Sequence, residues 1–178
     1  MKLEKADKTQ LRWMKKLYKT AFPKQERKPF WLMKRKQKQG IFEMLVVYDN
    51  EPLGLAITMR HKDIVLLDYY AIAPQARGKG VGSEALALLK KRYTGKRFFL
   101  EIEIPDIDAA NGEQRERRKA FYLRNGMIEI GMQACVAGVE MEILTNRCDL
   151  SYQEYQEVYE SCLGSSLARR IIQPLEGK

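Results

Sequence analysis

The segment from Ile64 to Tyr93 constrains the fold more than any other part of the chain. It begins with an almost unbroken apolar and aromatic run, Ile64–Ile72, which predicts a strand buried on both faces. A glycine-rich stretch follows, after which apolar residues recur at helical spacing from Val81 onward. A strand, a glycine-rich turn and a helix in this order form an anion-binding site, because the first N–H groups of a helix have no partner within it.

The glycine-rich stretch, residues 75–83, has the sequence QARGKGVGS. Its spacing is neither that of a Walker loop nor that of a dinucleotide fingerprint. It resembles the Gln/Arg-x-x-Gly-x-Gly/Ala signature of the GNAT superfamily of acyl-CoA-dependent N-acetyltransferases, and the matching residues are Gln75, Gly78 and Gly80. In that superfamily the amides of this loop hold the pyrophosphate of coenzyme A.

Two further elements extend the resemblance. Residues Phe121–Met127 are similar to the family's Phe/Leu-Tyr-x-x-x-Gly-Phe element, with Met127 in place of the final Phe. Residues Phe99–Glu103 resemble the strand that carries Leu-Glu-Val in several members. Because the three elements follow one another at family-like separations, the chain is identified as a member of the superfamily.

The predicted order of strands and helices agrees with this family and indicates an α/β sandwich. The resemblance implies an α/β, single-domain GNAT-like fold, with a central mixed, mostly antiparallel sheet flanked by helices. We expect one N-acetyltransferase domain over residues 1–178. It would comprise a basic helical acceptor-side segment (1–40), a core (41–145) and a C-terminal helix with a tail (146–178).

Capping patterns predict two of the helices in detail. Asp7 with Gln10 favours a helix that ends near Phe22, and Ser151 with Glu154 favours a last helix. From Gly164 onward the sequence predicts only a short, mobile tail.

The resemblance also implies a coenzyme site. Acetyl-CoA would be the cosubstrate, the loop amides would hold its phosphates, and the main chain at the end of the preceding strand would stabilise the oxyanion. The expected coenzyme-binding residues are Tyr70, Ala71, Ile72, Arg77, Gly78, Lys79, Gly80, Val81, Gly82 and Ser83.

Two residues are the expected catalytic groups by resemblance. Tyr122 would protonate the departing thiolate, since a phenol with a pKa near 10 is protonated at neutral pH, although a tyrosine here also suits simple packing. Glu101 is the first candidate for the general base, ahead of Glu103 and Asp68. Each of these acids equally suits an ion pair with Arg or Lys. The family's coenzyme-contacting Asn is replaced by Arg115, which leaves that contact in doubt.

Charge is distributed unevenly along the chain. Residues 1–40 hold 14 Lys and Arg against 3 acidic residues, whereas the remainder is nearly balanced. Such a segment can bind nucleic acid or an anionic membrane, but it also suits a solvated helix face. We favour the solvated face and expect no membrane partner, while nucleic-acid binding through this segment stays open for a binding module.

Other compositional features exclude several classes of protein. No apolar run approaches the length of a membrane span, and the first residues lack the apolar core of a secretory signal. The three cysteines and the one histidine lack metal-ligand spacing, so we expect no metal. An odd number of cysteines suits free thiols in a reducing cytoplasm.

The leading hypothesis is a cytoplasmic enzyme that acetylates a primary amine of a small molecule. The alternatives are a protein or peptide N-acetyltransferase and a catalytically weak acyl-CoA-binding module. A homodimer is one expected assembly, because dimers are frequent in the family. A further hypothesis is that acidic residues on the strands make the acceptor site negative and favour a cationic acceptor. These residues are Asp68, Glu101, Glu103, Glu140 and Glu142.

Overall fold

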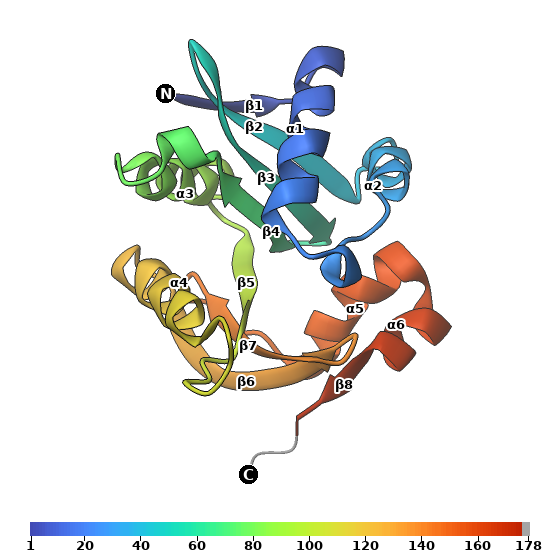
Figure 1. Ribbon diagram of the computed structural model, residues 1–178. Coiled ribbons are helices and arrows are strands. Elements are labelled where there is room, and N and C mark those ends of the chain that lie inside the picture. Colours follow the sequence, from blue (N-terminus) through green and yellow to red (C-terminus); the bar gives the residue numbers. More distant parts are fainter. Residues whose placement is uncertain (176–178) are drawn as a thin grey trace. The chain divides into compact units, whose positions relative to one another are not determined.

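The structure is a computed structural model, and it describes residues 1–175 (Figure 1). Its strands are β1 (Lys2–Lys5), β2 (Phe42–Asp49), β3 (Glu51–His61), β4 (Ile64–Ile72), β5 (Arg97–Glu103), β6 (Ile128–Val136), β7 (Val139–Thr145) and β8 (Ile172–Pro174). Its helices are α1 (Lys8–Ala21), α2 (Phe30–Gln37), α3 (Val81–Arg92), α4 (Gly112–Arg124), α5 (Tyr152–Leu163) and α6 (Ser165–Ile171), with short 3-10 turns η1 (Lys24–Glu26) and η2 (Pro74–Ala76).

The eight strands form one mixed sheet in the order β1-β2-β3-β4-β5-β7-β6-β8, which confirms the predicted α/β class with a mixed sheet and flanking helices. Contacts within the chain define two compact units, and β4 contributes residues to both. The first unit comprises Met1–Arg60 and Leu67–Thr94. The second comprises His61–Leu66 and the residues from Gly95 onward.

In the first unit, β1, β2 and β3 pair in antiparallel fashion. Asn50 forms the tip of the β2–β3 hairpin with a positive φ of 60°, between the paired residues Asp49 and Glu51. The core holds many almost completely buried large side chains, each worth about 1.5–3 kcal/mol of hydrophobic free energy. They include Met14, Met33, Phe42, Met44, Leu45, Leu55, Ile57 and Met59.

Helix α1 begins where the capping pattern predicted. The Asp7 side chain accepts from the Gln10 amide at 2.8 Å, and the Gln10 side chain accepts from the Asp7 amide at 2.9 Å. One face of the helix buries Met14, Leu17 and Tyr18. Its cations, Lys8, Arg12, Lys15, Lys16 and Lys19, are all exposed.

In the second unit, β7 pairs with both β5 and β6 in antiparallel fashion. Helix α4 lies against β5, and α5 contacts α6 (Figure 1). The core of this unit is aromatic: Phe98, Phe99, Tyr155 and Tyr159 are almost completely buried. The ring of Tyr155 meets that of Phe99 edge to face, with centroids 5.9 Å apart.

The predicted tail after Gly164 is wrong over the described residues. Gly164 ends α5 with a positive φ of 82°, and α6 and β8 follow. Strand β8 pairs with β6, with Cys135 opposite Gln173. A three-residue strand carries almost no periodic signal, and β6 supplies the hydrogen bonds that define it. Residues 176–178 of the predicted tail lie outside the described residues.

None of the helices in residues 1–175 has the length and apolar character needed to cross a membrane.

Candidate active site

The glycine loop joins β4 to α3 in the first unit. Gly78 and Gly80 have positive φ values of 73° and 78°, a conformation that only glycine adopts without strain. A Cβ on either residue would meet no atom within 4 Å. Backbone conformation therefore requires these glycines, and the protein leaves open the space beside them.

The first turn of α3 leaves its amides available. Gly80 is the N-cap residue and provides no side chain to cap the helix. Within residues 1–175, the first amide of this turn to bind a backbone carbonyl is that of Glu84, which donates to Gly80 at 3.1 Å. The amides of Val81, Gly82 and Ser83 point into the open space at the helix N-terminus, where an anion is stabilised.

The end of β4 is fixed against both β3 and α3. The Tyr70 hydroxyl donates to the Gly82 carbonyl at 2.6 Å, so the side chain of one predicted coenzyme-binding residue holds the main chain of another. A Cβ on Gly54 of β3 would lie 2.7 Å from the Ala71 carbonyl oxygen and 2.8 Å from Ile72 Cδ1. Gly54 was not among the site residues expected from the sequence, where its signal is a lone glycine within a strand pattern.

The two cations of the loop differ in their partners. Arg77 Nε donates to the Ile72 carbonyl at 3.0 Å, so this side chain folds back on β4 and braces the loop. Lys79 is exposed and has no ion-pair partner among residues 1–175. Lys79 is therefore the better placed of the two to meet a phosphate.

The other end of α3 is anchored to the buried carboxylate of Glu43. Arg92 binds both oxygens of Glu43, at 2.7 and 3.0 Å, and the Tyr93 hydroxyl donates to the same carboxylate at 2.6 Å. Burial alone would raise the pKa of Glu43, but the hydrogen bonds from Arg92 and Tyr93 lower it to about 2. This network fixes the helix whose N-terminus forms the open amide site.

Asp68 is ion-paired in the first unit. Its carboxylate lies 2.7 Å from Lys28 Nζ, and its side chain is only 4% exposed. Burial raises the pKa of Asp68, while the charge of Lys28 opposes that shift. The Lys28 amide also donates to the Tyr69 hydroxyl at 2.9 Å. The pair thus holds the loop between α1 and α2 on β4, which is the structural alternative that the sequence left open for Asp68.

In the second unit, Tyr122 lies on α4 and is 7% exposed. Burial raises its pKa to about 12, and the nearby Arg118 opposes this rise only in part. Within residues 1–175 its hydroxyl has no hydrogen-bond partner. The phenol is thus protonated at neutral pH and free to donate.

Glu101 lies on β5 and is held by α5. The Tyr159 hydroxyl lies 2.8 and 2.7 Å from its two carboxylate oxygens. Glu103, two residues along the strand, contacts a different helix. Its carboxylate binds Arg115 and Arg118 of α4, both at 2.9 Å. These two candidates for the general base therefore have separate partners.

Residue Arg115, which occupies the position of the family's Asn, is engaged within the protein. Besides Glu103, it binds the Asn111 side chain at 2.9 Å and the Ile104 carbonyl at 3.1 Å. The Asn111 side chain therefore binds the Arg115 guanidinium within the protein.

Three of the five acids named in the hypothesis of a negative acceptor site are paired with cations, and the hypothesis stays a prediction. Asp68 and Glu103 are bound by cations as described above, and Glu142 lies 2.9 Å from Lys119 Nζ. Glu140 is exposed. Glu101 is bound by a neutral hydroxyl.

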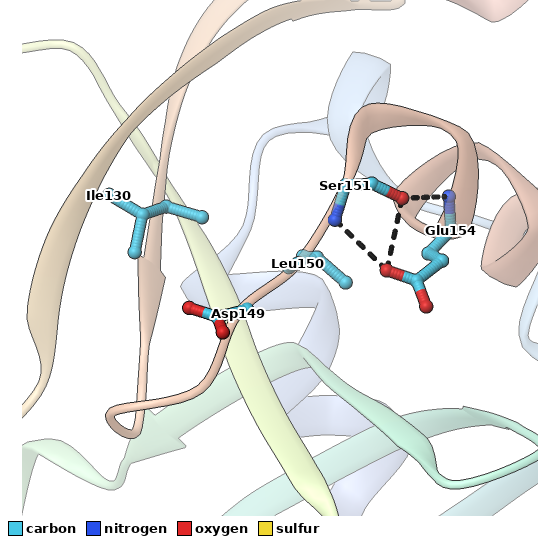
Figure 2. A pocket seen from close by; sticks show the side chains of 5 residues that line it. All are labelled: Ile130, Asp149, Leu150, Ser151 and Glu154. Carbon is cyan, nitrogen blue, oxygen red and sulfur yellow. Dashed lines mark hydrogen bonds between the residues drawn. The ribbon is translucent and has the colours of Figure 1, made fainter.

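A hollow of about 410 Å³ opens elsewhere in the second unit (Figure 2). Figure 2 shows Ser151 and Glu154 capping each other at the start of α5, with the Glu154 amide 3.3 Å from Ser151 Oγ. This helix N-terminus already holds a carboxylate, so a second anion is disfavoured there. No predicted site residue lines the hollow, whose lining is Ile130, Asp149, Leu150, Ser151 and Glu154.

No group of three or more His, Cys, Asp or Glu side chains that could hold a metal occurs in residues 1–175.

Solved structures share the fold. An acetyltransferase assigned to the GNAT family from Bacteroides thetaiotaomicron superposes with a TM-score of 0.77 at 16% identity, over 93% of this chain and 99% of that one. An aminoglycoside 6'-N-acetyltransferase complexed with coenzyme A gives a TM-score of 0.65 at 13% identity, over 85% and 100%. The spermidine/spermine N-acetyltransferase SpeG from Vibrio cholerae, in complex with manganese ions, gives 0.61 at 15% identity, over 81% and 90%.

At these identities the likeness is one of fold alone. No curated protein matches the sequence. The Acetyltransferase (GNAT) family, however, matches residues 10–127, a range that includes the glycine loop, β5 and Tyr122. The chain therefore belongs to the GNAT family of acetyltransferases, the acetyl-CoA-dependent transferases.

Proposed function

We propose that this protein transfers the acetyl group of acetyl-CoA to a primary amine of a small molecule. The observation that carries the proposal is the open N-terminus of α3, where the amides of Val81, Gly82 and Ser83 have no backbone partner within residues 1–175. Three amides and a helix dipole suit a pyrophosphate.

The binding roles divide between main chain and side chain. The amides from Gly78 to Ser83 would bind the phosphates, and the space beside Gly78 and Gly80 leaves room for close approach. Lys79 would add positive charge, while Arg77 would brace the loop. The main chain from Tyr70 to Ile72 would stabilise the oxyanion that forms as the amine attacks the thioester carbonyl.

Two side chains would move protons. Glu101 would accept a proton from the ammonium group of the acceptor, directly or through water, which leaves a neutral amine to attack the thioester carbonyl. Tyr122 would protonate the thiolate released when the C–S bond breaks. The pKa of about 12 supports Tyr122 as a donor, because the phenol keeps its proton throughout the range in which amines become nucleophilic.

The acceptor class rests on the chemistry of the solved neighbours. One is titled an aminoglycoside 6'-N-acetyltransferase and another a spermidine/spermine N-acetyltransferase, and both names denote small molecules with several amines. We extend to this chain only that class, a small amine. Cys135, Cys148 and Cys162 are free thiols, which suits a reducing cytoplasm.

A thiol-release assay with acetyl-CoA and a panel of amines tests the reaction. The panel should include amino acids, polyamines, aminoglycosides and short peptides. Turnover with a small amine is the expected result. Turnover with peptides alone would favour the protein-acetyltransferase alternative, and acetyl-CoA binding without any turnover would favour a binding module.

Tyr122→Phe tests the donor within this reaction. We expect turnover to fall by about 10²–10⁴-fold, the usual range for a lost general acid, with little change in acetyl-CoA affinity by calorimetry. In the unchanged protein, a pKa of about 12 predicts that ionisation of Tyr122 causes no decline in rate until the pH approaches that value. A fully active variant would assign the proton donor elsewhere.

A further inference from the structure

The hydroxyl of Tyr159 contacts both carboxylate oxygens of Glu101. It lies on α5, is only 1% exposed, and places its hydroxyl 2.8 and 2.7 Å from the two carboxylate oxygens of Glu101. A donor centred between both oxygens fixes the rotation of the carboxylate as well as its position. Residue Tyr159 lies beyond residues 10–127, the part of the chain that matches the GNAT family.

Ion pairs and a ring contact connect helix α5 to other parts of the second unit. Arg97 of β5 binds Glu154 at 2.7 Å, and Lys62 binds Glu157 at 2.8 Å. The ring of Tyr155 packs against that of Tyr159, with centroids 5.6 Å apart. The side chain of Tyr159 is therefore fixed by its helix and by its neighbours in the core.

The other charged residues of β5 have partners of their own, and a second tyrosine of α5 interacts with Glu101. On β5, Arg97 is bound by Asp63 and Glu154, and Glu103 is bound by two arginines of α4. The residue opposite Glu101 on β7 is Ile143. Tyr155 of α5 also interacts with this carboxylate. Burial is the main reason that the pKa of Tyr155 lies well above that of an ordinary tyrosine, and the negative charge of Glu101 adds to the rise.

We propose that Tyr159 is a positioning residue for acetyl transfer, whose hydroxyl holds the Glu101 carboxylate in its ionised form and in one orientation. The proposal rests on the function proposed above, in which Glu101 is the general base. A hydrogen bond donated to the charged form of a carboxylate favours that form. Without the hydroxyl, we expect Glu101 to take up its proton at higher pH and to lose this restraint on its orientation.

Tyr159→Phe removes only this hydroxyl, and Tyr152→Phe is the matched control. Tyr152 lies on the same helix, and its buried hydroxyl has no hydrogen-bond partner within residues 1–175. We expect Tyr159→Phe to move the acid limb of the pH–rate profile upward by about one pH unit, the size of one hydrogen bond to a charged group. Activity should recover toward that of the unchanged protein at high pH, whereas Tyr152→Phe should leave the profile unchanged.

A second measurement reads Glu101 without any turnover. The titration of its side-chain carboxyl, followed by NMR with ¹³C-labelled glutamate, should move to higher pH in Tyr159→Phe by the same amount. The reverse variant, Glu101→Gln, should lower the pH at which the Tyr159 phenol ionises, because a neutral amide stabilises the phenol less than a carboxylate does.

The outcomes separate the two proposals. An unchanged acid limb in Glu101→Gln would contradict the general-base role of Glu101, and the NMR titrations would still decide whether Tyr159 controls the carboxylate. If the Glu101 titration is the same in Tyr159→Phe as in the unchanged protein, Tyr159 has no positioning role. A change of equal size in Tyr152→Phe would assign the effect to general loosening of α5.

Discussion

The glycine loop of the first unit and the β5 carboxylates of the second differ in what fixes them. Main-chain conformation shapes the loop: Gly78 and Gly80 have positive φ values, and the amides of Val81, Gly82 and Ser83 have no backbone partner within residues 1–175. On β5, side chains from separate helices fix the acids. Tyr159 of α5 binds Glu101, and arginines of α4 bind Glu103.

This difference separates a binding surface from a reactive group. Main-chain amides do not titrate, so their ability to bind an anion depends only on the backbone conformation and on open space beside them. A carboxylate must keep a defined protonation state, which its neighbours set through hydrogen bonds and charge. We therefore expect substitutions in the loop to change coenzyme affinity, and substitutions around β5 to change the pH dependence.

The largest expected effect is that of Glu101→Gln. Loss of a general base typically costs about 10²–10⁴-fold in rate, and the acid limb of the pH–rate profile should weaken with it. The control is Glu103→Gln on the same strand, whose carboxylate is already engaged by Arg115 and Arg118 and should affect turnover far less. Equal losses of turnover in both variants would contradict a special catalytic role of Glu101 relative to Glu103.

Glu43→Gln extends the comparison to the far end of α3, where side chains anchor the helix. Losing the bonds from Arg92 and Tyr93 should cost about 1.5–3 kcal/mol of unfolding free energy, the range for hydrogen bonds to a charged group. Because the pKa of Glu43 is lowered to about 2, its stabilisation is complete above the unfolded value and is lost as the pH falls toward 2. Denaturant unfolding from pH 7 down to pH 2 checks this, with the exposed Glu51→Gln as control.

Gly54→Ala tests whether β3 supports the main chain at the end of β4. The added Cβ would lie 2.7 Å from the Ala71 carbonyl oxygen, so the strands must shift, at a cost of about 1–3 kcal/mol for overpacking. We expect a folded variant with weaker acetyl-CoA binding by calorimetry. Gly138→Ala is the control, because a Cβ there meets nothing within 4 Å; it should lose stability through strain and keep its affinity.

The smallest expected effect is that of Gly80→Ala. A non-glycine residue at a φ of 78° costs about 1–2 kcal/mol, and no clash adds to this cost. Gly80→Asn should lose less, because asparagine tolerates the left-handed region better. If thermal unfolding ranks alanine above asparagine, φ strain is not what requires glycine at this position.

Local signals predicted the first of the two regions well. An apolar strand, residues with positive φ and a following helix lie within about thirty consecutive residues, so the chain order already defines the loop. Both capping pairs, Asp7 with Gln10 and Ser151 with Glu154, also form as expected. The proposed roles of Tyr122, Glu101 and the loop residues remain predictions.

The sequence by itself thus determined the α/β class, the family and the position of the glycine loop, because each depends on neighbours along the chain. Only the tertiary structure decided which acid pairs with which group. Tyr159 is 58 positions from Glu101, and Lys28 is 40 from Asp68, so no periodic pattern connects them. It also revealed the need for Gly54 and the pairing of β8 with β6, since close approach and strand pairing exist only once distant segments are packed together.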